Sequence, residues 1–95
     1  MAQVLSITLM ENCLDSSQVK EFKLGTPLDE ALMRWMVQED RLLYYPDFPR
    51  PYFRIERKKA YVIQGVLDND HFRVTFMPSA KADEDLLLKK HIEEQ

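Results

Sequence analysis

The sequence predicts a single small α+β domain over residues 1–95, in which an antiparallel sheet of about five strands carries two helices on one face. Three observations lead to this class. Several short segments alternate apolar and polar residues, as half-buried strands do. Two other segments repeat apolar residues at helical spacing, and short turns separate the strands. The predicted order of elements is ββαβββα.

The chain begins with a predicted β-hairpin. Residues 3–10, QVLSITLM, place Leu5, Ile7 and Leu9 on one face of a strand. The turn-forming residues ENCLDSS follow, and QVKEFKL then alternates again, with Phe22 and Leu24 directed inward. We therefore expect two antiparallel strands whose inner faces carry these apolar side chains.

A helix is predicted over residues 27–40, because GTPLDE has the features of a helix start. Thr26 can cap the first turn, and Pro27 occupies a position where a missing N–H costs nothing. The face expected to pack on the sheet comprises Leu28, Ala31, Leu32, Trp35 and Met36. Met33 and Val37 form a second flank, which either the N-terminal hairpin or a partner covers.

Three strands of an antiparallel meander are predicted in YFRIER, AYVIQGVL and HFRVTFM, joined by the tight turns KK and DND. A final helix follows in LLLKKHIEE, capped by Ser79 or Asp83, with Leu87, Leu88 and Ile92 as its buried stripe. The expected core is the apolar set Leu5, Ile7, Leu9, Phe22, Leu24, Leu32, Trp35, Met36, Phe53, Ile55, Phe72, Val74, Phe76, Leu88 and Ile92.

The composition indicates a reducing compartment. The only cysteine, Cys13, cannot form an intramolecular disulfide. The N-terminal residues MAQVLSITLMEN lack a basic region and a cleavage site, and no apolar run approaches the roughly 18 residues that a spanning helix needs. We therefore expect a cytoplasmic protein that neither enters nor crosses a membrane.

Residue types that carry common chemistries are scarce. The two glycines, Gly25 and Gly65, are too few for a glycine-rich phosphate loop. One cysteine and two histidines, His71 and His91, do not supply the ligands of a structural zinc ion. The carboxylates beside His71 belong to the predicted turn DND, where turn geometry favours Asp and Asn. We therefore expect no catalytic residues, no metal ion and no cofactor.

One segment has an unusual composition. YYPDFPRPYF, residues 44–53, holds five of the ten aromatic residues and three of the five prolines. It lies in a locally basic zone, because residues 41–59 contain six basic and two acidic side chains in a chain of net charge −3. Aromatic residues mixed with arginine are enriched in protein interfaces and in surfaces that stack single-stranded nucleic acid. The prolines lack backbone donors, so the segment cannot be an interior strand.

Two interpretations of residues 44–53 are open: a crossing that closes the end of the core, or a binding surface. For the second, we expect Phe53 to lie in the core and Tyr45, Phe48 and Tyr52 to be at least partly exposed. The candidate partner-binding residues are Tyr44, Tyr45, Phe48, Arg50, Tyr52, Arg54, Arg57, Lys58 and Lys59.

The favoured partner is a protein, which includes a second copy of the chain, and the alternative is RNA or single-stranded nucleic acid bound through residues 41–59. Residues 27–94 run αβββα, an order similar to that of the double-stranded RNA-binding domain, but the second helix opens with Asp83, Glu84 and Asp85, which repel phosphate. The sequence therefore predicts a small non-catalytic protein-interaction or regulatory module, able to self-associate. A small enzyme or an enzyme accessory subunit is a second alternative.

Overall fold

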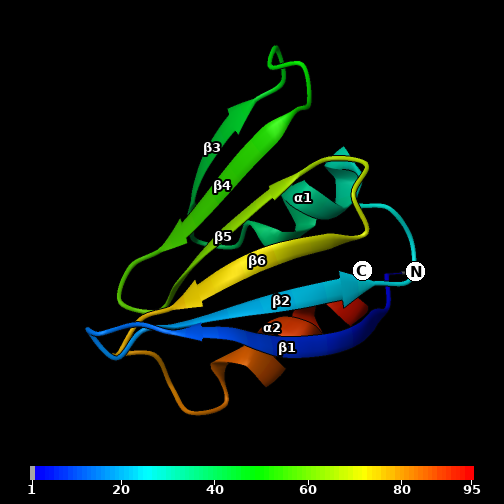
Figure 1. Ribbon diagram of the computed structural model, residues 1–95. Helices are drawn as coiled ribbons and strands as arrows, with labels where there is room; N and C mark the ends of the chain where they lie inside the picture. Colours follow the sequence, from blue (N-terminus) through cyan, green and yellow to red (C-terminus); the bar gives the residue numbers. More distant parts are fainter. Residues whose placement is uncertain (1) are drawn as a thin grey trace.

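The computed structural model describes residues 2–95 and contains one six-stranded antiparallel sheet and two helices (Figure 1). The strand order across the sheet is β1-β2-β6-β5-β4-β3. The elements are β1 (Val4–Asn12), β2 (Gln18–Leu24), α1 (Glu30–Met36), β3 (Arg41–Tyr45), β4 (Tyr52–Arg57), β5 (Tyr61–Val66), β6 (His71–Phe76) and α2 (Glu84–Glu93). The predicted α+β class is confirmed, with six strands where about five were expected.

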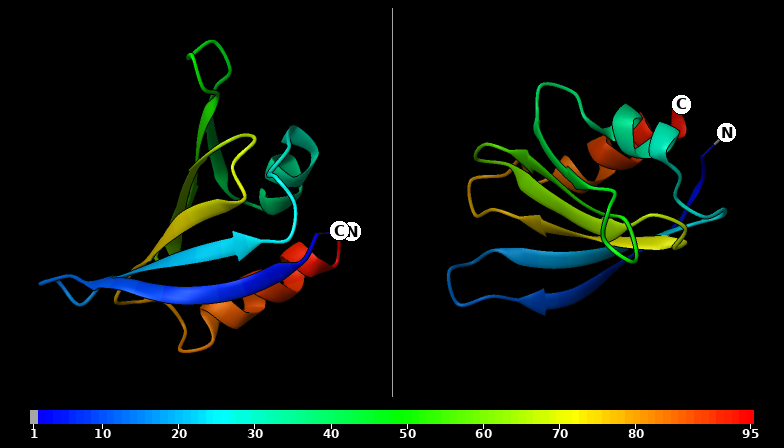
Figure 2. Two further views of the ribbon diagram at one scale, coloured as in Figure 1. Left: turned by 45° about the vertical axis from the view of Figure 1, so that its right-hand side comes forward. Right: turned by 90° about the horizontal axis from the view of Figure 1, so that it is seen from above.

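Both helices cover the same face of the sheet, as the view from above in Figure 2 shows. That face carries the large apolar side chains, because successive strand residues point to opposite sides. On β6, for example, Phe72, Val74 and Phe76 are buried while His71 and Arg73 are exposed. We call the opposite face of the sheet the outer face; neither helix of residues 2–95 lies on it.

The strand missing from the sequence prediction is β3, at one edge of the sheet. Its residues RLLYY contain four apolar or aromatic side chains in a row, which do not show the alternation typical of a half-buried strand. The register with β4 places Leu42 opposite Ile55 and Tyr44 opposite Phe53 on the inner face. Residues 41–45 are therefore a strand rather than part of a helix-to-strand crossing.

The opposite edge strand, β1, corrects two of the predicted core residues. The pairing with β2 shifts register between Val4 and Ser6 and again between Leu9 and Glu11. Each such bulge inserts an extra residue and reverses the inward and outward alternation. Val4 is consequently buried and Leu5 is 55% exposed, so the prediction of Leu5 as a core residue was wrong. Leu9, also predicted to be in the core, lies on the face of Ile7 but pairs with Lys20 at the edge of the sheet and is 47% exposed.

Helix α1 is shorter than predicted and starts later. Asp29, rather than Thr26, is the N-cap, and its carboxylate accepts a hydrogen bond of 2.8 Å from the backbone N–H of Leu32. The helix therefore has only two turns, and its buried residues are Leu32, Met33 and Met36. Met33 is fully buried, whereas Trp35, predicted to be in the core, is 39% exposed.

Helix α2 packs on the same face through Leu88 and Ile92, as predicted. Leu87 is exposed, contrary to the prediction, and Glu84 is buried in its place. Asp83 occupies the N-cap position without a side-chain cap bond, and Ser79 instead donates a hydrogen bond to the Lys59 carbonyl. The buried stripe of α2 is therefore rotated toward Glu84.

The two helices are joined by a reciprocal pair of hydrogen bonds. Trp35 Nε1–H donates to the His91 carbonyl at 2.7 Å, and His91 Nε2 donates to the Trp35 carbonyl at 2.8 Å. The two rings stack with centroids 5.1 Å apart. Trp35 therefore fastens α1 to α2 at the surface of the molecule instead of filling the core beneath it.

The centre of the core depends on a glycine. A Cβ at Gly65 would lie 3.0 Å from both Phe53 Cε1 and Phe72 Cβ, so a side chain there meets two fully or nearly fully buried residues. Phe53 pairs directly with Gly65 across β4 and β5. The missing side chain makes room for the Phe53 ring.

We predict that Gly65→Ala destabilises the protein by about 1 to 3 kcal/mol, the usual cost of overpacking a core. Gly25→Ala is the matched control, because a Cβ there has no neighbour closer than 3.8 Å. We expect Gly25→Ala to change the free energy of unfolding by about 0.5 kcal/mol or less. Urea denaturation of the two variants tests this, and equal effects would contradict the packing assigned to Gly65.

Candidate functional site

Residues 44–53 form the tip of the β3–β4 hairpin, which projects beyond the rest of the sheet at the top of Figure 1. Tyr44 and Tyr45 end β3, and Tyr52 and Phe53 begin β4. The loop between them carries all three prolines of the segment. It is tied to the β5–β6 turn, where Arg50 donates a hydrogen bond to Asn69 and the Leu67 N–H donates to the Pro51 carbonyl at 2.9 Å.

Three aromatic side chains gather at this tip and form what we call the aromatic cluster, Tyr45, Phe48 and Tyr52. The Tyr45 ring stacks on Phe48 at 5.1 Å and on Tyr52 at 6.0 Å between centroids. Tyr45 and Tyr52 are directly opposite each other on the outer face. Tyr45 is 40% exposed and Phe48 is 52% exposed, while Phe53 is fully buried. The predicted burial of Phe53 and exposure of the other three are confirmed.

Residues of β3 and β5 support the aromatic cluster. The Tyr52 hydroxyl donates a hydrogen bond of 3.0 Å to Gln64 on β5. Leu43, which shares the outer face of β3 with Tyr45, extends the apolar surface along the edge strand. Neither Leu43 nor Gln64 was among the predicted binding residues, because the first lay in an unrecognised strand and the second is brought close only by strand pairing.

Tyr44 points the other way. It pairs with the buried Phe53 on the inner face, packs partly against the core, and has the Arg34 guanidinium 5.7 Å from its ring centroid. Burial and the neighbouring Glu30 carboxylate raise the pKa of Tyr44. The structure therefore separates Tyr44 from the aromatic cluster, although the two tyrosines are adjacent in the sequence.

Several of the predicted basic residues are already paired with acids. Arg54 Nε lies 2.7 Å from the Glu56 carboxylate, and Arg57 Nε lies 2.8 Å from that of Asp40. The Asp40 side chain is only 1% exposed, so the pair it makes with Arg57 is part of the packed structure. These two arginines contribute little free positive charge to the surface.

Lys58 and Lys59 lie in the β4–β5 turn and are exposed, with no ion-pair partner within residues 2–95. This turn is at the opposite end of β4 from Tyr52. Tyr52 and Arg57 are five residue steps apart along the strand, a distance of roughly 17 Å. The predicted basic and aromatic residues therefore do not form one continuous surface.

A hollow of about 330 Å³ lies between α2 and the edge of the sheet where β4 ends and β5 begins. Ionisable side chains line it. Two of them have side-chain partners: Arg57 pairs with Asp40, and His91 donates to the Trp35 carbonyl. Burial, together with the negative charge of Asp40, raises the pKa of Tyr61 to about 12. The Tyr61 phenol therefore stays protonated at neutral pH and is poorly suited to act as a base or nucleophile.

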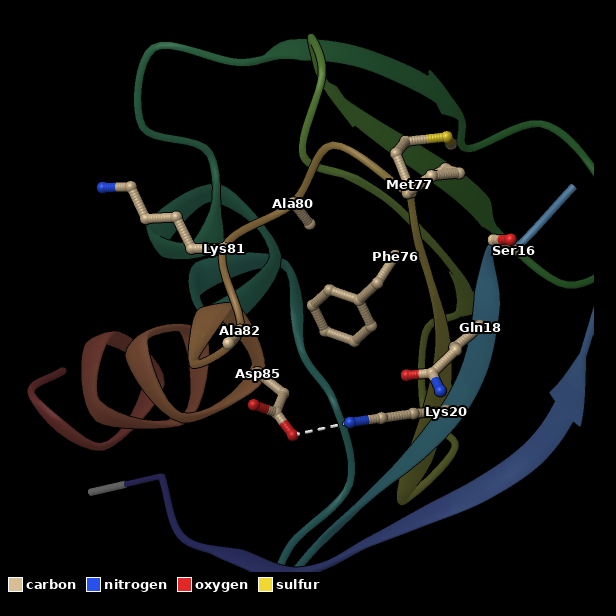
Figure 3. Close-up of a pocket in the computed structure, with 10 residues that line it drawn as sticks. Ser16, Gln18, Lys20, Phe76, Met77, Ala80, Lys81, Ala82 and Asp85 are labelled. Carbon is tan, nitrogen blue, oxygen red and sulfur yellow. Dashed lines mark hydrogen bonds and ion pairs between the residues drawn. The ribbon is translucent and has the colours of Figure 1, made fainter.

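A second, smaller hollow of about 170 Å³ lies beside Phe76 and is drawn in Figure 3. Its polar wall is an ion pair, in which Lys20 Nζ lies 2.8 Å from the Asp85 carboxylate and 5.6 Å from the Phe76 ring centroid. The pair connects β2 to the first turn of α2. The hollow therefore lies where α2 packs against the sheet.

Other candidate groups lie apart. His71 contacts only its neighbour Asp70 among the ion pairs, and Asp68 adopts the positive φ of 74° expected of a turn residue. No cluster of three or more potential metal ligands occurs among residues 2–95. In the same part of the chain, neither helix has the length and apolar character needed to traverse a bilayer.

Comparison of the chain with protein-family models, with curated proteins and with solved structures finds no match. Function is therefore inferred from the geometry of this chain.

We predict losses of stability of very different size for alanine substitutions at two phenylalanines that are five residues apart. Phe53→Ala should cost about 3 to 5 kcal/mol of stability, since it empties a fully buried aromatic site. Phe48→Ala removes a half-exposed ring and should cost about 1 kcal/mol or less. Thermal denaturation of both variants tests the assignment, and a large fall in the midpoint of the Phe48 variant would mean that the ring seals the core.

Proposed function

We propose that this protein is a small, non-catalytic interaction module of the cytoplasm that binds a protein partner through the outer face of the β3–β4 hairpin. The observation that carries the proposal is the aromatic cluster: three stacked rings, two of them 40% and 52% exposed, on a sheet face that no helix covers. Exposed aromatic residues in contact with one another are the composition of interface anchors.

The tip is preorganised for binding. Its prolines restrict the loop, and hydrogen bonds from Arg50 to Asn69 and from Tyr52 to Gln64 tie it to β5 and the β5–β6 turn. A surface that is already ordered loses less conformational entropy when it docks. The rings can therefore act as anchors without a folding step.

The charges around the cluster indicate the chemistry of the partner. Arg50 is exposed in the loop, whereas Arg41 is at the other end of the same edge strand, 3.9 Å from the Glu56 carboxylate. A complementary surface would present an apolar pocket for Phe48 and acidic groups beside it, because complementary charges favour correct association.

Nucleic acid fits less well. Stacking of bases on the cluster would need cations along the path of the phosphates. The unpaired Lys58 and Lys59 are instead at the far end of β4, and Arg54 and Arg57 are matched by Glu56 and Asp40. Protein binding through apolar anchors uses the surface without these cations.

We predict that affinity purification of the tagged protein from its native lysate recovers a protein partner in the presence and absence of nuclease. Phe48→Ala should reduce its recovery by about tenfold or more, since loss of an anchor costs about 2 kcal/mol. Quantitative mass spectrometry of the eluates measures this.

Leu86→Ala is the control for loss of exposed apolar area, because Leu86 is 59% exposed but lies on α2, away from the tip. It should leave recovery unchanged. A double variant, Lys58→Glu with Lys59→Glu, should also retain the partner. Loss of the partner on nuclease treatment, or equal loss in the Phe48 and Leu86 variants, would contradict the proposal.

A further inference from the structure

The two edges of the sheet differ. Strand β1 has two register shifts, and bulges of this kind protect an edge from pairing with another chain. Strand β3 pairs with β4 through five consecutive residues without a shift and contains no proline or lysine. Among residues 2–95, no strand lies on its other side. Its outward backbone groups therefore form a regular template for a further strand.

We propose that this further strand is β3 of a second copy of the chain, paired antiparallel about a two-fold axis at Leu43. The inference rests on the proposed function, and it assigns self-association to the edge of β3 beside the aromatic cluster. In this register Leu43 is opposite the second copy's Leu43, and Arg41 is opposite the second copy's Tyr45. On the inner side, Leu42 is opposite the second copy's Tyr44.

Each of these cross-strand pairs is complementary. The Arg41 side chain, which is 72% exposed and 3.9 Å from the Glu56 carboxylate of its own chain, can extend to the second copy's Tyr45 ring as a cation–π pair. The two Leu43 side chains pack against each other at the axis. Leu42 with the second copy's Tyr44 extends the apolar core of each subunit across the interface. A register centred on Arg41 would instead oppose two guanidinium groups, which is destabilising. The sequence RLLYY thus favours the register centred on Leu43 over the one centred on Arg41.

The arrangement has a consequence for partner binding. Residues directly opposite each other in antiparallel strands point to the same side of the sheet, so both aromatic clusters lie on one continuous outer face. The two Tyr45 residues are separated by four residue steps along the strands, roughly 13 Å. A dimer would thus present two anchors to a partner, and binding at one would raise the effective concentration at the other.

The interface is small, because it rests on one five-residue edge. Interfaces below the standard size are typically weak or transient. We therefore expect a dimer that forms at high micromolar concentration and dissociates on dilution. Light scattering and sedimentation of the unmodified protein should show this change of mass.

Cysteine crosslinking tests the register in a Cys13→Ser background. Leu43→Cys should give a disulfide-linked dimer under mild oxidation, because the axis brings each residue 43 to within about 4.5 to 5.5 Å of its own copy between Cα atoms. Arg41→Cys and Tyr45→Cys should each remain monomeric alone and crosslink when mixed. Leu5→Cys, exposed at the bulged edge, is the matched control and should give about tenfold less dimer.

A chain that stays monomeric at high micromolar concentration, or that crosslinks through residue 5 as readily as through residue 43, overturns this inference. If the partner is still recovered and is still lost in Phe48→Ala, the proposed function stands without the dimer. If the dimer forms and no partner depends on Phe48, the dimer stands and the proposed function fails.

Discussion

The pairing of β2 with β6 is the interaction on which the rest of the structure depends. It places Phe22 directly opposite Phe72, with stacked rings 5.3 Å apart, although the two residues are far apart in the sequence. This ladder joins the N-terminal hairpin to the meander of β4, β5 and β6, with β3 added at the far edge. Because both phenylalanines point to the same face, α1 and α2 must cover that face to bury them, and the outer face is left without a helix.

The parts of the fold that could be predicted from the sequence are those set by local periodicity. Alternation in β4 and β6 identified Phe53, Phe72 and Val74 as core residues. Periodicity could not locate the bulges of β1, because a bulge depends on how two strands align, and so Leu5 was placed inside. Periodicity also failed to identify β3, because its apolar run does not alternate. It placed Trp35 in the core, whereas the position of this side chain depends on where α2 lies.

The candidate site was predicted in composition but not in arrangement. The prolines of residues 44–53 indicated correctly that Tyr45 and Phe48 would be exposed, because all three prolines lie in or beside the loop, where a missing backbone donor interrupts no strand. Tyr52 and Phe53 nevertheless begin β4, which lies between β3 and β5, so the expectation that the segment forms no part of an interior strand was wrong. The charge count of residues 41–59 was misleading for a physical reason. It treated Arg57 as free, whereas the carboxylate of Asp40 is 2.8 Å away, and it grouped the lysines with rings at the other end of the same strand.

The difference between the regular edge, β3, and the bulged edge, β1, can be measured by comparing amide hydrogen exchange at two protein concentrations. Outward amides of β3 lack a strand partner in the isolated chain. If β3 pairs with a second copy, protection at Arg41–Tyr45 rises when the concentration is raised from low to high micromolar, while protection in β1 does not change. Protection of β3 that is independent of concentration, or a rise confined to β1, would contradict this pairing.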